Sequence, residues 1–222
     1  MSAAALLVLA DGRFPAGGHA HSGGAEAAVK AGRITGAADL GTFCRGRLHT
    51  SGLVAAALAA ASCAGVLDPL TLDEAADART PSPALRATAR KLGRQMTRAA
   101  RAAWPSPELE ALAAARPRGA HQPVVLGLAA RAAGLRPLDA AYAAAYESVS
   151  GPATAAVRLL SLDPFDATGV LARLAPELDE VAGQAAATAR TDDTDTLPAA
   201  SAPLLDIAAE DHATWHMRLF AS

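Results

Sequence analysis

The feature that most constrains the fold is a succession of alanine- and leucine-rich runs separated by proline and glycine. In the run from Pro83 to Trp104, apolar residues recur every three or four positions. That spacing places them on one face of a helix. Hydrophobic residues make up 51% of the chain but aromatic residues only 4%. Alanine, the strongest helix former, therefore supplies much of the apolar surface, and we predict an all-α protein.

The same patterns predict a single domain of roughly eight to ten helices over residues 1–190. Helices are expected over residues 3–10, 22–32, 40–67, 71–78, 83–104, 108–115, 123–133, 139–162 and 167–189. Gly151-Pro152 lies inside one of them and should kink or split it. At 222 residues the chain can bury a substantial core without disulfides or metals.

Residues 14–26 interrupt this pattern with a loop that holds four glycines, one proline, two histidines and a serine. Glycine adopts backbone conformations that other residues avoid, and it lets another backbone or a partner come close. Ser22 can cap the helix that follows. Glu26 falls in the first turns of that helix, where a carboxylate meets the positive end of the dipole. We predict a tight glycine loop followed by a capped helix.

Residues 191–222 are predicted to form an acidic linker and a C-terminal tail. The linker, residues 191–196, is polar and unpatterned, which is typical of a mobile segment. In the tail, Leu219 and Phe220 follow Arg218 just before the chain ends. Terminal residues usually fray unless they are held, and arginine is a favoured interface anchor. We therefore expect the tail to bind a partner protein.

Charge and cysteine content argue against several classes of protein. The formal net charge of −2 argues against nucleic acid as a partner, because phosphate binding needs clustered lysine and arginine. The arginines within 86–101 are expected to form a solvated helix face or, alternatively, a docking stripe for an acidic partner.

Cys44 and Cys63 lie in apolar surroundings, as buried reduced thiols of a cytosolic protein do. The longest apolar run, 53–67, is short for a membrane span of about 20 residues, and residues 1–10 lack the basic leader of a signal peptide.

The sequence contains no motif of an active site that we can identify. It lacks the phosphate-binding pattern Gly-x-x-x-x-Gly-Lys-Ser/Thr, the Gly-x-Ser-x-Gly elbow, His-Glu-x-x-His and Cys-x-x-Cys. We predict that the chain is not an enzyme and does not itself hydrolyse GTP.

The histidines allow two interpretations. His19 and His21 could bind a metal such as nickel, and so could His212 and His216, which would share a helix face. We favour the simpler alternative, in which the first pair is exposed loop surface and the second contacts a partner or caps a helix. His121 is expected to satisfy backbone groups at a helix start.

Four blocks along the chain resemble the UreF family of urease accessory proteins. The matching residues are Pro15, Gly17, Gly18, Ser22, Gly24 and Glu26 in the glycine loop; His121, Pro123, Val124, Gly127, Gly134 and Leu135 in the middle; Ala155, Ala156, Arg158, Leu159 and Leu162 further on; and Asp206, Ile207, His212, Arg218, Leu219, Phe220 and Ser222 at the end. His19 and His21 stand where the family has aromatic residues, and Asp163-Pro164 replaces its Gly-Gln.

The resemblance implies a cytoplasmic, non-enzymatic maturation factor. Such a protein would form a homodimer, bind the UreD/UreH accessory protein and recruit the nickel-carrying GTPase UreG, so that nickel reaches apo-urease. No cofactor is expected to be tightly held, since nickel is handled by the complex. The small-residue helix faces would form the dimer. The partner-binding residues would be Gly17, Gly18, His19, His21, Ser22, Glu26, Arg218, Leu219 and Phe220.

Two alternatives belong to other classes of function. The first is an enzyme in which His19, His21 and Glu26 hold a metal ion for hydrolysis. The second is a regulator that restrains or activates the GTPase.

Overall fold

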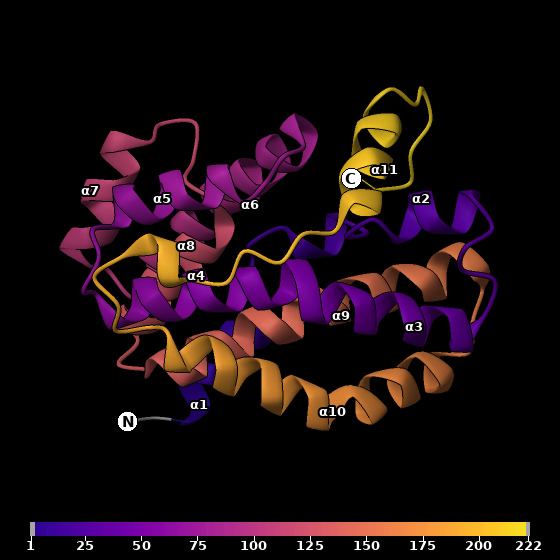
Figure 1. Ribbon diagram of the computed structural model, residues 1–222, viewed down its shortest axis with the longest axis horizontal. Helices are drawn as coiled ribbons and strands as arrows, with labels where there is room; N and C mark the ends of the chain where they lie inside the picture. Colours follow the sequence, from indigo (N-terminus) through magenta and orange to yellow (C-terminus); the bar gives the residue numbers. More distant parts are fainter. Residues whose placement is uncertain (1–2, 221–222) are drawn as a thin grey trace.

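The computed structural model describes residues 3–220 and, within them, contains helices and no strands (Figure 1). The predicted all-α class is therefore confirmed. Its α-helices are α1 (Ala3–Ala10), α2 (Ala25–Lys30), α3 (Ala37–Arg47), α4 (Leu53–Ala64), α5 (Pro69–Ala78), α6 (Pro83–Ala103), α7 (Pro107–Ala115), α8 (Gln122–Ala132), α9 (Pro137–Leu160), α10 (Pro164–Ala187) and α11 (Pro203–Ala213). Short helical turns are η1 (Gly18–Ala20), η2 (Leu48–Gly52) and η3 (Thr194–Thr196).

Prolines begin several of the helices. Pro83 begins α6, as predicted, and Pro107 begins α7 one residue before the predicted start. Ser82 Oγ accepts the N–H of Leu85 at the start of α6, and Ser106 Oγ accepts the N–H of Leu109 at the start of α7. In each helix a proline follows the capping serine directly, where its missing N–H has no intrahelical partner to lose. A Ser-Pro or Asp-Pro pair in this chain therefore marks a helix start as well as a stop.

The long helix predicted over residues 40–67 is a continuous rod made of α3, η2 and α4. The backbone stays in the right-handed helical region across both junctions, and η2 is a π-helical segment. Such segments insert an extra residue into a helix and often lie at functional sites. The sequence pattern predicted the rod but not its π-helical centre.

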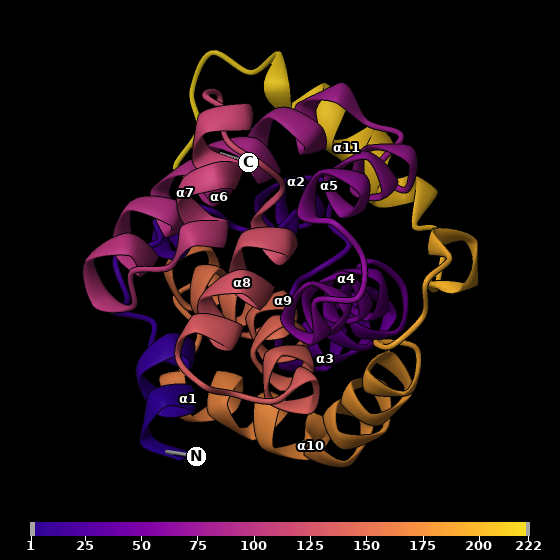
Figure 2. The same cartoon turned by 90° about the vertical axis from the view of Figure 1, so that its left-hand side faces the viewer.

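The rod lies in the middle of the molecule. It runs beside α9 and α10 along the long axis (Figure 1), and the end-on view shows α8 and α9 on one side of it and α10 below (Figure 2).

Close packing of the rod against its neighbouring helices depends on small residues. A Cβ on Gly127 of α8 would lie 2.3 Å from the carbonyl oxygen of Ala59 in α4. The alanine faces of α4, α8 and α9 are thus buried inside one chain, so the expectation that small-residue faces form a dimer is wrong for these helices.

Helix α9 continues through Pro152 without a break. The helix was expected to kink or split at Gly151-Pro152, and the split is wrong. Pro152 is buried, and its ring lies against the glycine loop, where a Cβ on Gly23 would be 3.1 Å from Cγ of the proline. Tertiary packing holds the helix together at this point despite the lost backbone hydrogen bond.

Residues 191–196 are held against the helices and do not form a free linker. The guanidinium of Arg79 donates to the carbonyl oxygens of Thr194, Leu197 and Pro198, at 2.6, 3.2 and 3.0 Å. Composition alone predicted mobility for this segment, because the bonds that hold it come from a residue more than a hundred positions earlier.

A buried ionic network joins α5, α6 and the start of α8. Asp73 is fully buried, and its carboxylate accepts hydrogen bonds from Arg90, Arg116 and the backbone N–H of His121. Arg90 had been expected on a solvated helix face, so that expectation is wrong for this residue. A buried carboxylate is stable only when its charge is matched in this way.

Both cysteines are buried and free of disulfide bonds, as predicted. Burial raises the pKa of each thiol to about 11, which keeps both protonated. No helix in the described part of the chain is both long enough and apolar enough to span a bilayer.

Candidate functional site

The backbone of the glycine loop turns left-handed at three glycines, Gly17, Gly23 and Gly24. Gly17 has φ of +83° and lies against Gln95 of α6, and Gly24 has φ of +89°. A Cβ on Gly24 would lie 3.2 Å from Leu205 of α11 and 3.6 Å from Phe43 of α3. The loop thus packs between the rod and the C-terminal helix.

The loop leads into α2, which begins at Ala25 and not at Ser22 as predicted. Gly24 occupies the capping position. Ser22 Oγ still accepts the N–H of Glu26 at 3.3 Å, so it satisfies one amide of the first turn. Glu26 lies in that first turn, as predicted.

The Glu26 carboxylate binds the C-terminal tail. It accepts the backbone N–H groups of Leu219, at 2.7 Å, and Phe220, at 3.1 Å, and it lies 2.9 Å from Nε2 of His212. Burial raises the pKa of Glu26, but the hydrogen bonds from Leu219, His212 and Phe220 outweigh burial and hold it below its usual value. We call these four residues the Glu26 cluster. The two ends of the chain are therefore joined by one ionised side chain.

The tail residues predicted to bind partners differ in exposure. Phe220 is only 5% exposed, and the guanidinium carbon of Arg158 lies 5.0 Å from its ring centre. Arg218 is exposed, and Leu219 is 70% exposed. Phe220 therefore anchors the tail within this chain, whereas Arg218 and Leu219 face outward. The predicted match at Ser222 lies outside the described residues.

Other exposed apolar side chains lie in the same C-terminal segment. Leu204 and Ile207 are each 66% exposed on α11, and Met217 follows in the tail at 90%. Together with Arg218 and Leu219 we call these the exposed tail residues. Large exposed apolar side chains that gather in one segment are typical of protein-binding surfaces.

The four histidines considered as metal ligands are not gathered. His19 is exposed, but His21 is buried, so the expectation of an exposed loop pair is wrong for His21. Helix α11 ends at Ala213, so His212 and His216 do not share a helix face. Among residues 3–220, no group of three or more histidine, cysteine, aspartate or glutamate side chains could hold a metal ion.

His121 precedes α8, but its side chain makes no capping bond. Its ring Nε2 lies 2.7 Å from Asp77 instead, so the predicted capping role is wrong.

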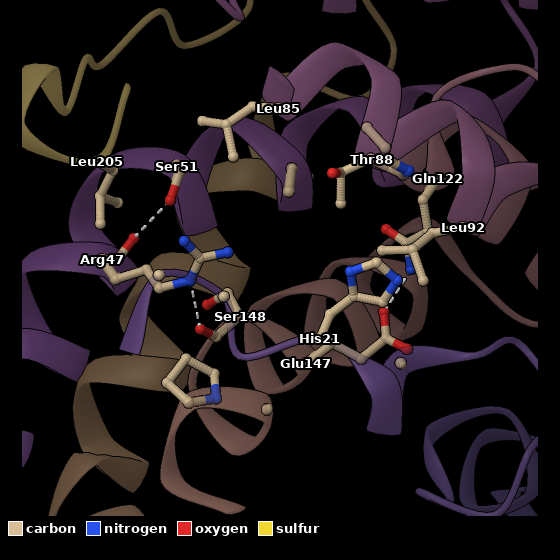
Figure 3. Close-up of a pocket in the computed structure, with 18 of the residues that line it drawn as sticks. His21, Arg47, Ser51, Leu85, Thr88, Leu92, Gln122, Glu147, Ser148 and Leu205 are labelled. Carbon is tan, nitrogen blue, oxygen red and sulfur yellow. Dashed lines mark hydrogen bonds between the residues drawn. The ribbon is translucent and has the colours of Figure 1, made fainter. Parts of the chain in front are cut away.

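Beneath the glycine loop lies a pocket of about 500 Å³ (Figure 3). Apolar residues of the rod and of α6 form much of its lining, and Leu85 and Leu92 of α6 are among them. Pockets of this volume are typical of small-molecule and cofactor sites. His21, His212 and Phe220 also belong to the lining, so the glycine loop and the tail meet at this pocket.

Two ionisable side chains stand on opposite sides of the pocket (Figure 3). On one side, Arg47 Nε donates to the carbonyl oxygen of Ser148 at 2.8 Å. On the other, Gln122 Nε2 donates to Glu147 at 2.5 Å. Burial raises the pKa of Glu147 to about 7, and the Gln122 bond opposes that shift only partly. Burial, chiefly, lowers the pKa of His21 to about 4, so its imidazole is neutral at pH 7.

The sequence analysis did not single out Arg47, Gln122 or Glu147 as site residues. A signal was present, because Glu147 interrupts an alanine-rich helix and Arg47 interrupts the mostly apolar spacing of its own helix. Placing them at one pocket requires the packing of α9 against the rod, which no local pattern contains.

Comparison with known proteins agrees with this architecture. Residues 34–175 match the family model described as UreF. The chain is 44% identical over 98% of its length to a urease accessory protein UreF of Mycobacterium sp. (strain JLS), covering 97% of that protein. It is 44% identical to that of Mycolicibacterium vanbaalenii, over 100% of this chain and 99% of the relative. For Mycobacterium tuberculosis (strain H37Rv) the identity is 41%, with the same coverage.

These relatives are accessory proteins and not enzymes, so the alternative of a metal-dependent hydrolase is wrong. Within that class, the chain belongs to the UreF family. The predicted resemblance is therefore confirmed. The glycine loop and the tail lie outside the matched range 34–175, but the relatives cover both.

Proposed function

We propose that this protein is a scaffold in urease maturation. It binds the UreD/UreH accessory protein and the GTPase UreG at once, and thereby supports nickel insertion into apo-urease. The observation that carries the proposal is the C-terminal segment, which exposes Ile207, Arg218 and Leu219 while Glu26 fixes its backbone. A surface that is ordered before binding loses less entropy on association.

The proposal gives different roles to the residues that hold the tail and to the residues that the tail exposes. Glu26 and the buried Phe220 hold the tail, and the exposed Arg218 and Leu219 contact the GTPase. Of the remaining predicted loop residues, Gly17, Gly18 and His19 belong to the surface for the UreD/UreH partner. His21 and Ser22 are buried and are not part of that surface. Nickel is cargo of the assembly and not a tightly bound ion of this chain.

We further propose a cytoplasmic homodimer. Because the alanine faces of α4, α8 and α9 are used inside one chain, other apolar residues must form the contact. Phe165, which is 85% exposed at the start of α10, is one candidate. Light scattering of the purified protein tests the dimer, and Phe165→Ser should shift it toward the monomer.

The recruitment step is tested with Arg218→Ala. The complex of this protein with UreD/UreH is immobilised, and the amount of retained UreG is measured. We expect retention to fall at least tenfold, with UreD/UreH binding unchanged. Arg190→Ala, at an exposed arginine beyond α10, is the matched control. Retention equal to that of the unchanged protein would remove the tail from the proposal.

The same samples address the alternative of a GTPase regulator. GTP turnover by UreG is measured with and without this protein. A scaffold leaves turnover per bound UreG unchanged, whereas a regulator changes it.

A further inference from the structure

The lining of the pocket beneath the glycine loop includes Arg47 and Glu147, neither of which forms an ion pair within the described part of the chain. Arg47 donates to a carbonyl oxygen but forms no ion pair with any carboxylate of residues 3–220. Glu147 accepts a bond from Gln122 but, within the same residues, has no cationic partner. Partly buried charges without a counter-charge are costly, because water no longer solvates them fully.

The other charged side chains in the lining are already engaged. Asp11 pairs with Arg13, Arg79 donates to backbone carbonyls, and Asp206 accepts the N–H of Ser82. Arg79 and Asp206 also form no ion pair among residues 3–220, but Arg79 donates to four backbone carbonyl oxygens, whereas Arg47 donates to one.

The surroundings of Arg47 fix its position. Its Nε bond to Ser148 holds it against α9, and a Cβ on Gly23 would lie 3.4 Å from its guanidinium carbon. A Cβ at position 23 would therefore be in van der Waals contact with the guanidinium. The terminal nitrogens of Arg47 point toward the pocket (Figure 3).

Between the two charges the lining is mainly apolar. Leu85 and Leu92 of α6 form one wall (Figure 3), and Tyr146, which is 40% exposed, marks an accessible part of the lining. An occupant that matches this pattern carries an acidic group, an apolar middle and a basic group.

We propose that the pocket receives a segment of a partner protein that places an acidic side chain on Arg47, an apolar side chain against α6 and a basic side chain on Glu147. Charge complementarity at two points fixes the direction of the segment, and the apolar contact supplies affinity. The inference rests on the proposed scaffold function only in taking the occupant to be protein.

The raised pKa of Glu147 also predicts that binding of the segment depends on pH. A basic side chain binds the ionised form, so binding should strengthen as the pH rises from 6 to 8. The contact at Arg47 should not change over that range, because arginine stays protonated.

The test uses the full-length protein and synthetic peptides with blocked ends. Each peptide carries one glutamate and one lysine separated by one, two or three leucine or alanine residues, and affinity is measured by calorimetry. We expect at least one spacing to bind saturably. Replacing its glutamate or its lysine by glutamine should weaken binding at least tenfold, and only the lysine-containing peptides should bind more tightly at pH 8 than at pH 6.

Protein variants complete the test. Arg47→Gln and Glu147→Gln should each weaken the best peptide at least tenfold. The controls are Arg45→Gln and Glu180→Gln, at exposed positions of α3 and α10, which should bind as the unchanged protein does. If a pocket variant does not fold, the peptide substitutions still decide the question on the unchanged protein.

Two results would overturn the inference. One is that no charged peptide binds more tightly than its glutamine-substituted parent. The other is that Arg47→Gln binds the best peptide as well as Arg45→Gln does. Neither result affects GTPase recruitment by the tail, which Arg218→Ala tests separately.

Discussion

Glu26 and His212 lie 186 positions apart in the sequence, yet the Glu26 carboxylate is 2.9 Å from Nε2 of the histidine. The same carboxylate accepts the N–H groups of Leu219 and Phe220. Both glutamate oxygens are used, and this is why a carboxylate suits the position better than an amide. The contact joins the first and last of the blocks that resemble the family.

Replacing Glu26 by Gln should release the tail. An amide offers one acceptor oxygen where the carboxylate offers two, and it loses the charge that strengthens each bond. Hydrogen exchange of the Leu219 and Phe220 amides should speed up by about tenfold or more, since a hydrogen bond to a charged group contributes about 1.5–3 kcal/mol. Glu74→Gln, at an exposed position on α5, should leave both amides protected. Unchanged protection in Glu26→Gln would mean that Phe220 packing alone holds the tail.

Acidification should release the same contact. The folded-state pKa of Glu26 lies below its unfolded value of about 4.3. The stabilisation is therefore fully present above that value and is lost as the pH falls through the folded-state pKa. Trp215 reports on it, because its ring lies 4.7 Å from that of His212.

The measurement is Trp215 fluorescence in a Trp104→Phe background between pH 7 and pH 3. Unaltered Glu26 should give a transition below about pH 4.3, and Glu26→Gln should lack it. A transition of the same size in both proteins would assign the change to other carboxylates.

Replacing Asp73 by Ala should strongly destabilise the protein. Arg90 and Arg116 would lose a buried counter-charge, and the N–H of His121 would lose its acceptor. The expected loss is about 3 kcal/mol of unfolding free energy, measured by urea denaturation. Glu110→Ala breaks the half-exposed pair with Arg101 and should cost less than about 1 kcal/mol. Equal losses in the two variants would show that the buried network contributes no more to the free energy of unfolding than an exposed ion pair does.

Replacing Gly127 by Ala should disrupt the contact between α8 and α4. The new Cβ would lie 2.3 Å from the carbonyl oxygen of Ala59 and 2.6 Å from Cβ of Ser62, and backbone cannot move aside cheaply. We expect a loss of about 2–3 kcal/mol. Gly183→Ala in α10 has open space around it and should gain up to about 1 kcal/mol from helix propensity. A neutral Gly127→Ala would indicate that the two helices can separate without cost.

The local parts of the fold could be predicted from the sequence. The apolar spacing of residues 83–104 predicted α6 to within one residue, since α6 ends at Ala103. Glu26 was placed in the first turn of its helix, as observed. These features depend on neighbours within a few positions, which a sequence displays directly.

The rest depends on contacts between distant residues. Arg79 holds the acidic segment, Asp73 binds Arg90, and Arg47 shares a pocket with Glu147. Composition predicted a mobile linker and a solvated arginine face because it gives the number of charged residues but not their contact partners in the fold. The buried position of Phe220 was missed for the same reason.

The central claim is that this protein supports nickel insertion by presenting surfaces to other proteins. The most direct measurement is the nickel content per urease in cells that lack the protein and carry either the unchanged chain or Arg218→Ala. We predict near-complete metallation with the unchanged chain, and little nickel with Arg218→Ala or with no chain at all. Fully metallated urease in cells without the protein would contradict the account.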